Sequence, residues 1–170
     1  ITPDIKYFSL LRQFHEIRIA KMFARHKEYF FLFSSCNRNF RVFKERSESL
    51  WCGECPKCAF VFLMFAPFLE KKELIKIFGK NLLNVPTLLP LFKDLLGFGK
   101  IKPFDCVGTF EESKVAFVLA YKKFKNDIAI KELLPNIVVS DNLIKEVFSA
   151  HNAPTLPTQF KLLGLKNVGI

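Results

Sequence analysis

The stretch that decides the fold is WCGECPKCAFVFLMFAPFL, residues 51–69. Its cysteine-rich beginning passes directly into a continuous apolar run, Ala59–Leu69. This run is shorter than the roughly 20 residues that a membrane-spanning helix needs, so it predicts a helix buried inside the protein. Pro56 suits the first position of that helix, because a proline there loses no hydrogen bond, and Pro67 is expected to end or kink it.

Four cysteines have the spacing of a metal site, which reads Cys36-x15-Cys52-x2-Cys55-x2-Cys58. A two-residue gap lets a tight backbone turn aim neighbouring sulfurs at one ion, and the long gap brings the fourth sulfur from a separate loop. Four thiolates complete a tetrahedron and leave no position for a substrate. The sequence therefore predicts one structural zinc ion bound by these four residues.

Two other uses of the cysteines stay open at this point. Disulfides suit secreted proteins, but no charged and then apolar leader opens the sequence. An iron–sulfur cluster is a stronger alternative, because C-x2-C-x2-C with a remote cysteine also occurs in ferredoxin-type sites. In those sites the proline follows the remote cysteine, whereas Pro56 follows the second cysteine of the triplet. A visible absorption spectrum separates zinc from iron.

Helices are predicted around this centre, with few short strands. Thr109 and Glu112 form a capping-box pair, and glycines follow two other segments of helical periodicity. The aromatic run Tyr29–Phe33 has the length and composition of a strand. We expect a mainly α fold, with residues 1–150 as a zinc-stabilised helical domain and residues 151–170 as an extended tail. Besides the buried helix after Pro56, the expected helices are 9–23, 70–78, 87–96, 109–125 and 142–150.

The balance of charges is basic. The chain carries 26 Lys and Arg against 16 Asp and Glu, a formal net charge of +10. The simple interpretation is a soluble surface rich in lysine, and the alternative is contact with anions such as phosphates, carboxylates or nucleic acid. All arginines lie between Arg12 and Arg46, and guanidinium groups bind such anions with paired hydrogen bonds. Nucleic acid is the less favoured partner, because the aromatic residues follow core periodicity rather than alternating with basic residues.

Four blocks of residues resemble one family, in the same order. They are SCN at 35–37, WCGECPKC at 51–58, APFL at 66–69 and KPFDCVG at 102–108. Together they resemble the C-terminal part of the UDP-N-acetylmuramoyl-L-alanyl-L-glutamate epimerases of bacterial cell-wall synthesis, with a resemblance that extends from Ile5 to Ala120. The first block with the cysteine triplet is also similar to the zinc knot of 7-cyano-7-deazaguanine synthase, an ATP pyrophosphatase.

The epimerase resemblance implies a function. It implies that the complete enzyme inverts the terminal L-Glu of UDP-MurNAc-L-Ala-L-Glu to D-Glu in the cytoplasm. The same resemblance implies that the complete enzyme uses ATP and Mg²⁺. It also implies that the chain is the C-terminal part of an ATP-pyrophosphatase-like α/β enzyme. Such an enzyme needs a Ser-Gly-Gly-x-Asp-Ser-like phosphate loop, which this sequence lacks. We therefore expect the nucleotide-binding segment in a missing N-terminal part, and we expect this chain alone to be inactive.

Candidate site residues follow from the same blocks. Cys106 and Asp105 are candidates for proton transfer at the glutamate Cα, because a thiolate can serve in cofactor-free epimerisation. The alternative for Cys106 is a buried free thiol. Arg12, Ser35 and Asn37 are candidate substrate-binding residues, although Arg12 could be a solvated surface residue. Ser35 and Asn37 could instead stabilise the turn that carries the first metal ligand.

Other functions stay open. One is that the chain is a fragment of a deazaguanine-synthase-like ATP pyrophosphatase, which is of the same enzyme class but acts on a different substrate. Another is a non-catalytic zinc module that binds nucleic acid, whose affinity should fall steeply with salt. A split or decayed gene product without activity is the third. Nothing in the sequence suggests a membrane partner.

Overall fold

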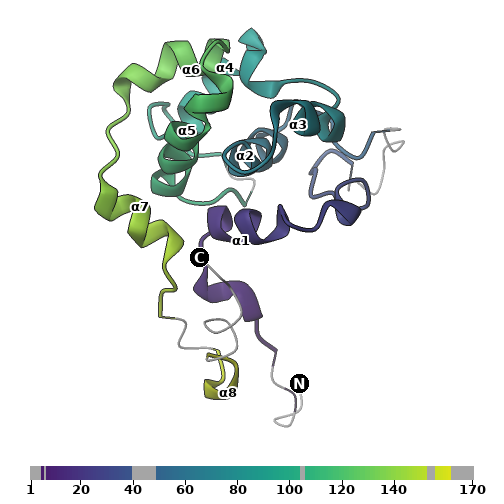
Figure 1. The fold of residues 1–170 in the computed structure, drawn as a ribbon, viewed down its shortest axis with the longest axis vertical. Helices are drawn as coiled ribbons and strands as arrows, with labels where there is room; N and C mark the ends of the chain where they lie inside the picture. The colour runs from purple at the N-terminus through teal and green to yellow at the C-terminus, as the bar shows by residue number, and fades with distance from the viewer. Residues whose placement is uncertain (1–4, 6, 40–48, 104–105, 153–155, 162–170) are drawn as a thin grey trace.

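A computed structural model describes residues 5, 7–39, 49–103, 106–152 and 156–161. These residues form helices joined by turns, so the prediction of a mainly α fold is confirmed. The described residues contain no strand, and the prediction of a few short strands is wrong for this part of the chain. Helix α2 (Pro56–Phe65) lies at the centre, and α1 (Glu16–Phe23), α3 (Lys71–Phe78) and α5 (Phe110–Phe124) lie around it (Figure 1).

Helix α2 is the predicted buried helix, and its sequence sets where it begins and ends. Cys55 is the N-cap, whose sulfur accepts a hydrogen bond from the backbone N–H of Cys58 at 3.4 Å, and Pro56 takes the first helical position. The helix ends at Phe65, shortly before Pro67. Because it is apolar on all sides, it packs against α1, α3, α4 (Leu89–Leu95) and α5 at once. Its buried residues are Cys58, Ala59, Phe60, Phe62, Leu63, Met64 and Phe65.

Local capping chemistry sets the ends of α3 and α4. Glu70 and Glu73 form a capping box at the start of α3, and Gly79 (φ 76°) follows its end in the left-handed conformation. Gly97 (φ 78°) takes the same left-handed conformation after the end of α4. The predicted glycine stops of both helices are confirmed. Two 3-10 helices precede α4, η3 (Leu82–Asn84) and η4 (Pro86–Leu88).

Helix α5 begins with the predicted capping box. Thr109 Oγ1 accepts a hydrogen bond from Glu112 N at 3.2 Å, and Glu112 Oε1 accepts one from Thr109 N at 2.7 Å. The same carboxylate accepts a hydrogen bond from the backbone N–H of Ile17, in the first turn of α1, at 3.1 Å. One carboxylate, 1% exposed, therefore caps two helices that are far apart in the sequence. Gly108 leaves room for it, because a Cβ there would overlap Glu112 Oε1.

The last third of the chain forms α6 (Ile128–Leu133), α7 (Asp141–Phe148) and α8 (Thr158–Lys161), with a 3-10 helix, η5 (Leu134–Asn136), after α6. Helix α7 confirms the last predicted helix, whereas α6 was not expected. Buried Asp127, just before α6, accepts hydrogen bonds from Lys71 Nζ at 2.6 Å and Asn81 Nδ2 at 2.9 Å. These bonds join α6 to α3. Residues 153–155 and 162–170 of the predicted tail lie outside the described residues, and α8 falls between them.

The first predicted helix, 9–23, is divided in two. A 3-10 helix, η1 (Leu10–Gln13), is followed by extended backbone at Phe14 and His15 before α1 begins. The two pieces can therefore turn different sides toward the core.

The aromatic run Tyr29–Phe33 is not a strand, and that prediction is wrong. It consists of the end of a 3-10 helix, η2 (Lys27–Tyr29), and the turns that follow. Phe30 and Phe33 are three residues apart, as in a helical turn, and both rings contact Phe23, at 6.0 and 4.7 Å between centroids. Phe30 and Phe33 therefore pack on α1. The described residues contain no strand with which this run could pair.

A chain of ring contacts continues from this turn into the core. Phe33 contacts Trp51 at 5.3 Å between centroids, and Trp51 contacts Phe78 at 4.7 Å. Phe62 of α2 then contacts Phe78 at 5.2 Å and Phe124 at 6.1 Å. The abundant phenylalanines of the sequence therefore form the continuous interior that joins α2, α3 and α5.

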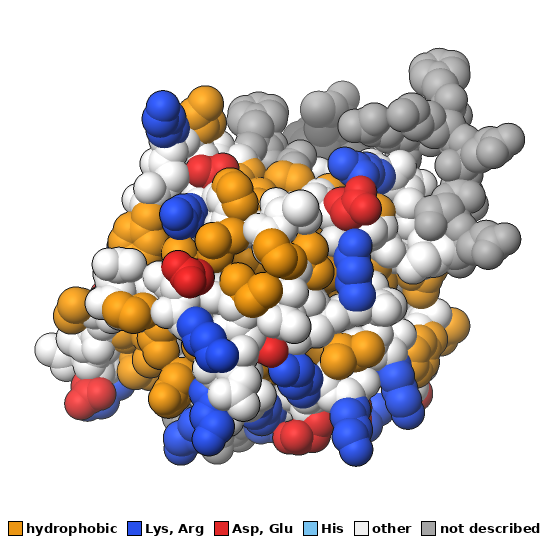
Figure 2. Space-filling view, turned by 90° about the horizontal axis from the view of Figure 1, so that it is seen from above, with side chains coloured by type: hydrophobic (Ala, Val, Ile, Leu, Met, Phe, Trp, Pro, Cys, Tyr) orange, Lys and Arg blue, Asp and Glu red, His pale blue; other side chains and the backbone are white. Residues whose placement is uncertain are grey.

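The surface has mixed charge at the end where α4 and α6 lie. Figure 2 shows that the basic side chains of this face are interspersed with acidic and apolar ones. The basic side chains are densest along the lower edge of this view, where a few acidic side chains lie among them. Within the described ranges, every helix is too short or too polar to cross a bilayer.

Candidate metal centre

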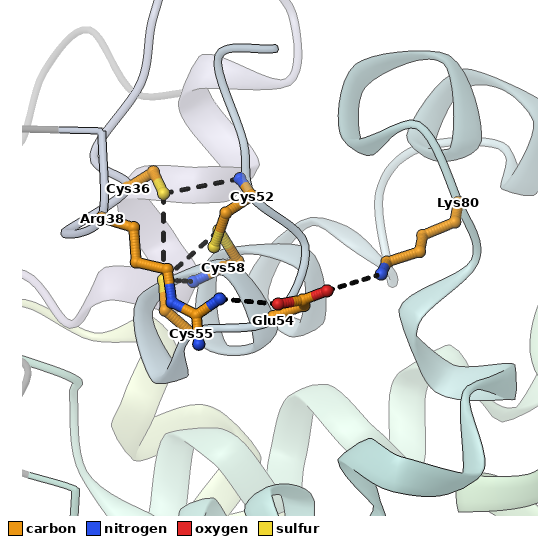
Figure 3. Close-up of polar contacts among 7 residues, drawn as sticks. All are labelled: Cys36, Arg38, Cys52, Glu54, Cys55, Cys58 and Lys80. Carbon is orange, nitrogen blue, oxygen red and sulfur yellow. Dashed lines mark hydrogen bonds and ion pairs between the residues drawn. The ribbon is translucent and has the colours of Figure 1, made fainter. Parts of the chain in front are cut away.

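The four predicted ligands come together at one point. The sulfur atoms of Cys36, Cys52, Cys55 and Cys58 all lie within 4.8 Å of one another and could hold a metal ion (Figure 3). Individual sulfur–sulfur distances are 3.9 Å for Cys36–Cys55, 3.7 Å for Cys52–Cys58 and 3.4 Å for Cys55–Cys58. A tetrahedral ion with metal–sulfur bonds of about 2.3 Å would place its sulfurs about 3.8 Å apart. The donor set therefore fits a single four-coordinate ion.

The chain folds to this geometry through short polar contacts around Cys36. Ser34 Oγ donates a hydrogen bond to the carbonyl of Leu50 at 2.5 Å and accepts one from Cys36 N at 3.2 Å. Asn39 Nδ2 donates to the carbonyls of Ser49 and Leu50, at 2.6 and 2.9 Å. These bonds hold the start and the end of the long gap side by side, so Cys36 reaches the cysteine triplet.

The triplet itself depends on a glycine and on the start of α2. Gly53 has φ +67°, a left-handed backbone that lets the chain turn between the first two sulfurs of the triplet. Cys55 and Cys58 then take the N-cap and the first turn of α2. Trp51, directly before the triplet, is 2% exposed, so the metal centre adjoins the aromatic core.

The sulfurs influence one another's ionisation. Hydrogen bonding from the Cys58 thiol lowers the pKa of Cys55 to about 4. The same contact raises the pKa of Cys58, and burial raises the pKa of Cys52. One thiolate is therefore favoured and the next ones are opposed, because each added negative charge repels the others. Full ionisation of such a set requires a cation among the sulfurs.

Charged residues surround the centre on its exposed side. Arg38 Nη1 lies 2.6 Å from Glu54 Oε2, and Lys80 Nζ lies 3.9 Å from Glu54 Oε1 (Figure 3). The hydrogen bond to Glu54 raises the pKa of Arg38. Arg38 therefore reaches across the sulfurs and closes the loop by an ion pair. This arrangement suits an anionic metal–thiolate group, which a nearby guanidinium stabilises.

Cys106, one of the two predicted catalytic residues, is linked to the first turn of α2, which carries two of the four clustered cysteines. Cys106 is exposed, which excludes the buried free thiol, and its φ of 49° is the one positive value among the described non-glycine residues. Its carbonyl accepts a hydrogen bond from Lys57 Nζ at 2.8 Å. Lys57 stands in α2 between the two metal ligands Cys55 and Cys58. Asp105, the other candidate, lies outside the described residues.

A hollow of about 280 Å³ lies between α1 and α2 beside the metal centre. Its walls are mainly apolar, and Glu16, Ser35 and Lys57 supply its polar groups. The structure therefore brings predicted Ser35 close to the residue that holds Cys106. Arg12 is exposed on η1 and Asn37 is exposed beside the first metal ligand, and neither lines this hollow.

Sequence reasoning missed several residues that position these groups. The turn of Cys36 is held by Ser34 and Asn39 rather than by Ser35, and Lys57 was not singled out. The available signal was weak, because short polar residues near a metal ligand are common and contacts between distant segments leave no local pattern.

The metal-centre region belongs to a stretch that matches known proteins. The family model described as the MurL C-terminal domain matches residues 32–144. A protein of Xanthomonas oryzae pv. oryzae named UDP-N-acetyl-alpha-D-muramoyl-L-alanyl-L-glutamate epimerase is 45% identical over 139 residues, which are 81% of this chain and 31% of that protein. Proteins of the same name from Salinispora tropica and a Micromonospora species are each 47% identical over 113 residues, 66% of this chain.

The matched region is only part of those relatives. The Salinispora and Micromonospora matches cover 24% and 25% of their proteins. The chain therefore spans about a quarter to a third of the length of the curated relatives that it matches. No solved structure matches the chain.

Proposed function

The chain belongs to the family of MurL C-terminal domains, and on this basis we propose that it is the C-terminal domain of an epimerase of peptidoglycan precursor synthesis. In this proposal the complete enzyme inverts the terminal L-Glu of UDP-MurNAc-L-Ala-L-Glu to D-Glu. The observation that carries it is the 45% identity, over 81% of this chain, to a protein named as that epimerase.

The proposed reaction needs activation of a carboxylate. The C–H next to a carboxylate is a very weak acid, because the carbanion would stand beside an existing negative charge. Transfer of AMP from ATP to the carboxylate, with loss of pyrophosphate, removes that charge and provides an electron sink. A base then takes the Cα proton, a proton returns on the opposite face, and water releases AMP.

Within this scheme the present chain supplies groups near the inverted carbon. We assign proton transfer to Cys106, with Asp105 as the other candidate. Cys106 has an exposed thiol and an unusual backbone conformation, and Lys57 holds its carbonyl at the edge of the hollow that Ser35 lines. Arg12, Ser35 and Asn37 stay candidates for contacts to the substrate's phosphate, carboxylate or peptide groups.

The metal centre has a structural role in this proposal, and zinc is the ion that suits it. Four sulfurs fill a tetrahedral shell, so no position remains for substrate or water. The sulfurs all lie within 4.8 Å of one another, which suits one ion better than a [4Fe–4S] cluster, in which each cysteine binds a different iron and the sulfurs stand further apart. Elemental analysis should find one zinc per chain, with no visible absorption; iron and a coloured protein would contradict the assignment.

Activation by ATP and Mg²⁺ belongs to the preceding part of the longer relatives in this proposal. The chain lacks a Ser-Gly-Gly-x-Asp-Ser-like loop, and we expect the purified chain to release no AMP from ATP. Measurable AMP release by this chain alone would contradict the assignment of ATP activation to the preceding part.

The direct test is a chimera in which this chain replaces the matching segment of the Xanthomonas oryzae relative. With UDP-MurNAc-L-Ala-L-Glu, ATP and Mg²⁺, chiral analysis of the hydrolysed product should detect D-Glu. A folded chimera that forms AMP but no D-Glu would contradict the proposed function. Cys106→Ser should abolish exchange of the glutamate Cα hydrogen with deuterium, and Cys106→Ser with full exchange would remove Cys106 from the mechanism.

Nucleic-acid binding has no specific support in the structure. The face in Figure 2 mixes basic, acidic and apolar side chains. Arg38, the one arginine beside the metal centre with a described ion pair, is engaged with Glu54. The basic net charge is therefore better explained by surface lysines.

A further inference from the structure

An exposed apolar surface lies on the segment that the sequence had suggested as a strand. In this segment, residues 29–33 and hereafter the aromatic turn, Tyr29 is 50% exposed, Phe31 60% and Leu32 75%. Large apolar side chains that stay in water on adjacent positions are unusual for a surface that has no partner. Most exposed large apolar side chains of the described residues also lie before residue 51, on the same part of the chain.

The backbone of the aromatic turn is fixed by ring contacts with the core and by hydrogen bonds. Phe30, 4% exposed, and Phe33 insert their rings against Phe23 and Phe65. Backbone hydrogen bonds link Leu32 N to the carbonyl of Tyr29 at 3.0 Å, and Phe30 N to that of Lys27 at 3.2 Å. The exposed side chains are therefore presented by a fixed backbone, which lowers the entropy lost on binding.

The aromatic turn stands between two hollows of the surface. One, of about 230 Å³, is lined by Phe30, Phe31 and Ile77, with Lys27, Glu73 and Lys76 around it. The other is the hollow of about 280 Å³ beside the metal centre, to which Phe33 contributes. Exposed anchors beside apolar hollows with charged rims are typical of a protein-binding surface.

The family comparison points to the occupant. The relatives are three to four times longer than their matched segments, and the match is to their C-terminal domain. That match begins at residue 32, so the aromatic turn lies where the segment shared with the family model begins. We propose that the aromatic turn and the hollow lined by Phe31 and Ile77 bind the preceding, N-terminal part of the longer family proteins, which leaves the hollow beside the metal centre to the substrate. This inference rests on the proposed function only in assigning the chain to a larger enzyme.

The small extent of the surface favours this occupant over a second copy of the chain. Stable protein–protein interfaces bury about 800 Å² per partner, which is far more than three side chains provide. A domain joined through the same polypeptide needs less area, because the link keeps the two parts at high effective concentration. Interfaces between domains of one chain are correspondingly smaller and more polar.

The test uses one polypeptide in which the N-terminal part of the Xanthomonas oryzae relative is joined to the full 170-residue chain, because the link is what makes a small interface sufficient. We expect backbone amide hydrogen exchange at residues 29–33 to be at least tenfold slower in the joined protein than in the 170-residue chain alone. The variant Tyr29→Ser/Phe31→Ser/Leu32→Ser should lose this protection. The matched control is Ile101→Ser/Val138→Ser, which removes side chains that are 77% and 91% exposed elsewhere and should keep the protection in full.

Each outcome decides the proposal. Equal protection in the triple variant, or no protection in the unsubstituted joined protein, overturns it. A dimer of the chain alone in sedimentation, lost in the triple variant, assigns the surface to a second copy and also overturns it. If the triple variant does not fold, the unsubstituted joined protein decides the proposal: slower exchange at residues 29–33 than in the chain alone supports it, and unchanged exchange overturns it. The readout is contact between the two parts, so failure of the epimerase assignment leaves this test unaffected.

Discussion

The metal knot, residues 34–39 and 49–58, and the core around the second half of α2 are held together in different ways. In the core, Phe62, Leu63 and Phe117 have no exposed surface, and burial of apolar area supplies the stability. In the metal knot, the described contacts are four sulfurs, an ion pair and a few hydrogen bonds. From this comparison we expect the core to fold by burial and the knot to depend on an ion.

The two regions are nevertheless connected through one helix and one ring. Helix α2 begins with Cys55 and Cys58 in the knot and continues with Phe62 in the core. Trp51 precedes the cysteine triplet and contacts Phe78 in the core. Loss of the ion should therefore reach the core through Trp51 and the first turn of α2.

Removal of the metal is the change with the largest expected effect. Structural zinc sites contribute about 10–16 kcal/mol of apparent binding energy, of which we expect at least about 5 kcal/mol to appear as lost stability. This lowers the melting temperature by about 10–20 °C or more. Trp51 is the single tryptophan and is 2% exposed, so its fluorescence should shift to the red on chelation.

Two cysteine variants sharpen that experiment. Cys36→Ser removes one ligand and should reproduce the effect of the chelator, whereas Cys106→Ser makes the same chemical change at an exposed cysteine and should leave the melt unchanged. An unaltered melt and an unaltered Trp51 spectrum after complete chelation would show that the knot does not depend on an ion.

The core should respond to lost volume instead. Phe62→Ala should lower the free energy of unfolding by about 3–5 kcal/mol, because it leaves a cavity among Phe78, Phe124 and the rest of α2. Chemical denaturation measures this loss, and metal content should stay at one per chain. Phe98→Ala, at a ring that is 42% exposed, is the control and should cost far less. Loss of metal in folded Phe62→Ala would mean that the two regions are not separable.

The double helix cap should have an intermediate effect. Glu112→Ala leaves the N–H groups of Thr109 and Ile17 without their partner, at a cost of roughly 2–4 kcal/mol for one buried and one partly buried donor. Glu111→Ala, at the exposed neighbouring position, should change stability by less than about 0.5 kcal/mol. Denaturation of both variants measures the difference, and equal stability would show that the Ile17 contact carries no energy.

The smallest expected effect is at the edge of the aromatic turn. The hydrogen bond from Lys27, at 2.6 Å, lowers the pKa of Glu73 below its usual value. A lowered folded-state pKa stabilises the protein above the unfolded pKa of about 4.3 and loses this effect as pH falls through the folded pKa. Glu73→Gln keeps a side chain suited to the capping box, so at pH 7 it should cost only about 0.2–1 kcal/mol. Melts of both proteins should converge in acid; a constant difference down to pH 2 would rule out the ion pair as its cause.

Features with a local cause could be predicted from the sequence. The capping box of Thr109 and Glu112, the glycine stop at Gly79 and the helix start at Pro56 each depend on residues within one turn. The convergence of the four cysteines was also predictable, because the triplet spacing limits where its sulfurs can point.

Features with a distant cause could not be predicted in this way. The strand expected over Tyr29–Phe33 rested on composition, but α1 offers those rings a surface on which to pack, and this contact is not encoded locally. The contact of Lys57 with Cys106 likewise joins residues whose separation in sequence gives no periodic signal. The side chains at the metal centre were predictable, and those that hold the proposed reaction site in place were not.

The bond between Glu112 and Ile17 bears on how this domain can be cut from a longer protein. The family match starts at residue 32, yet α1 ends at Phe23 and takes the cap of its first turn from α5. A fragment trimmed to residues 32–144 would lose α1, leave Glu112 with a vacant acceptor in the interior and uncover one side of α2. The packed unit therefore starts ahead of residue 32, where the family model begins to match.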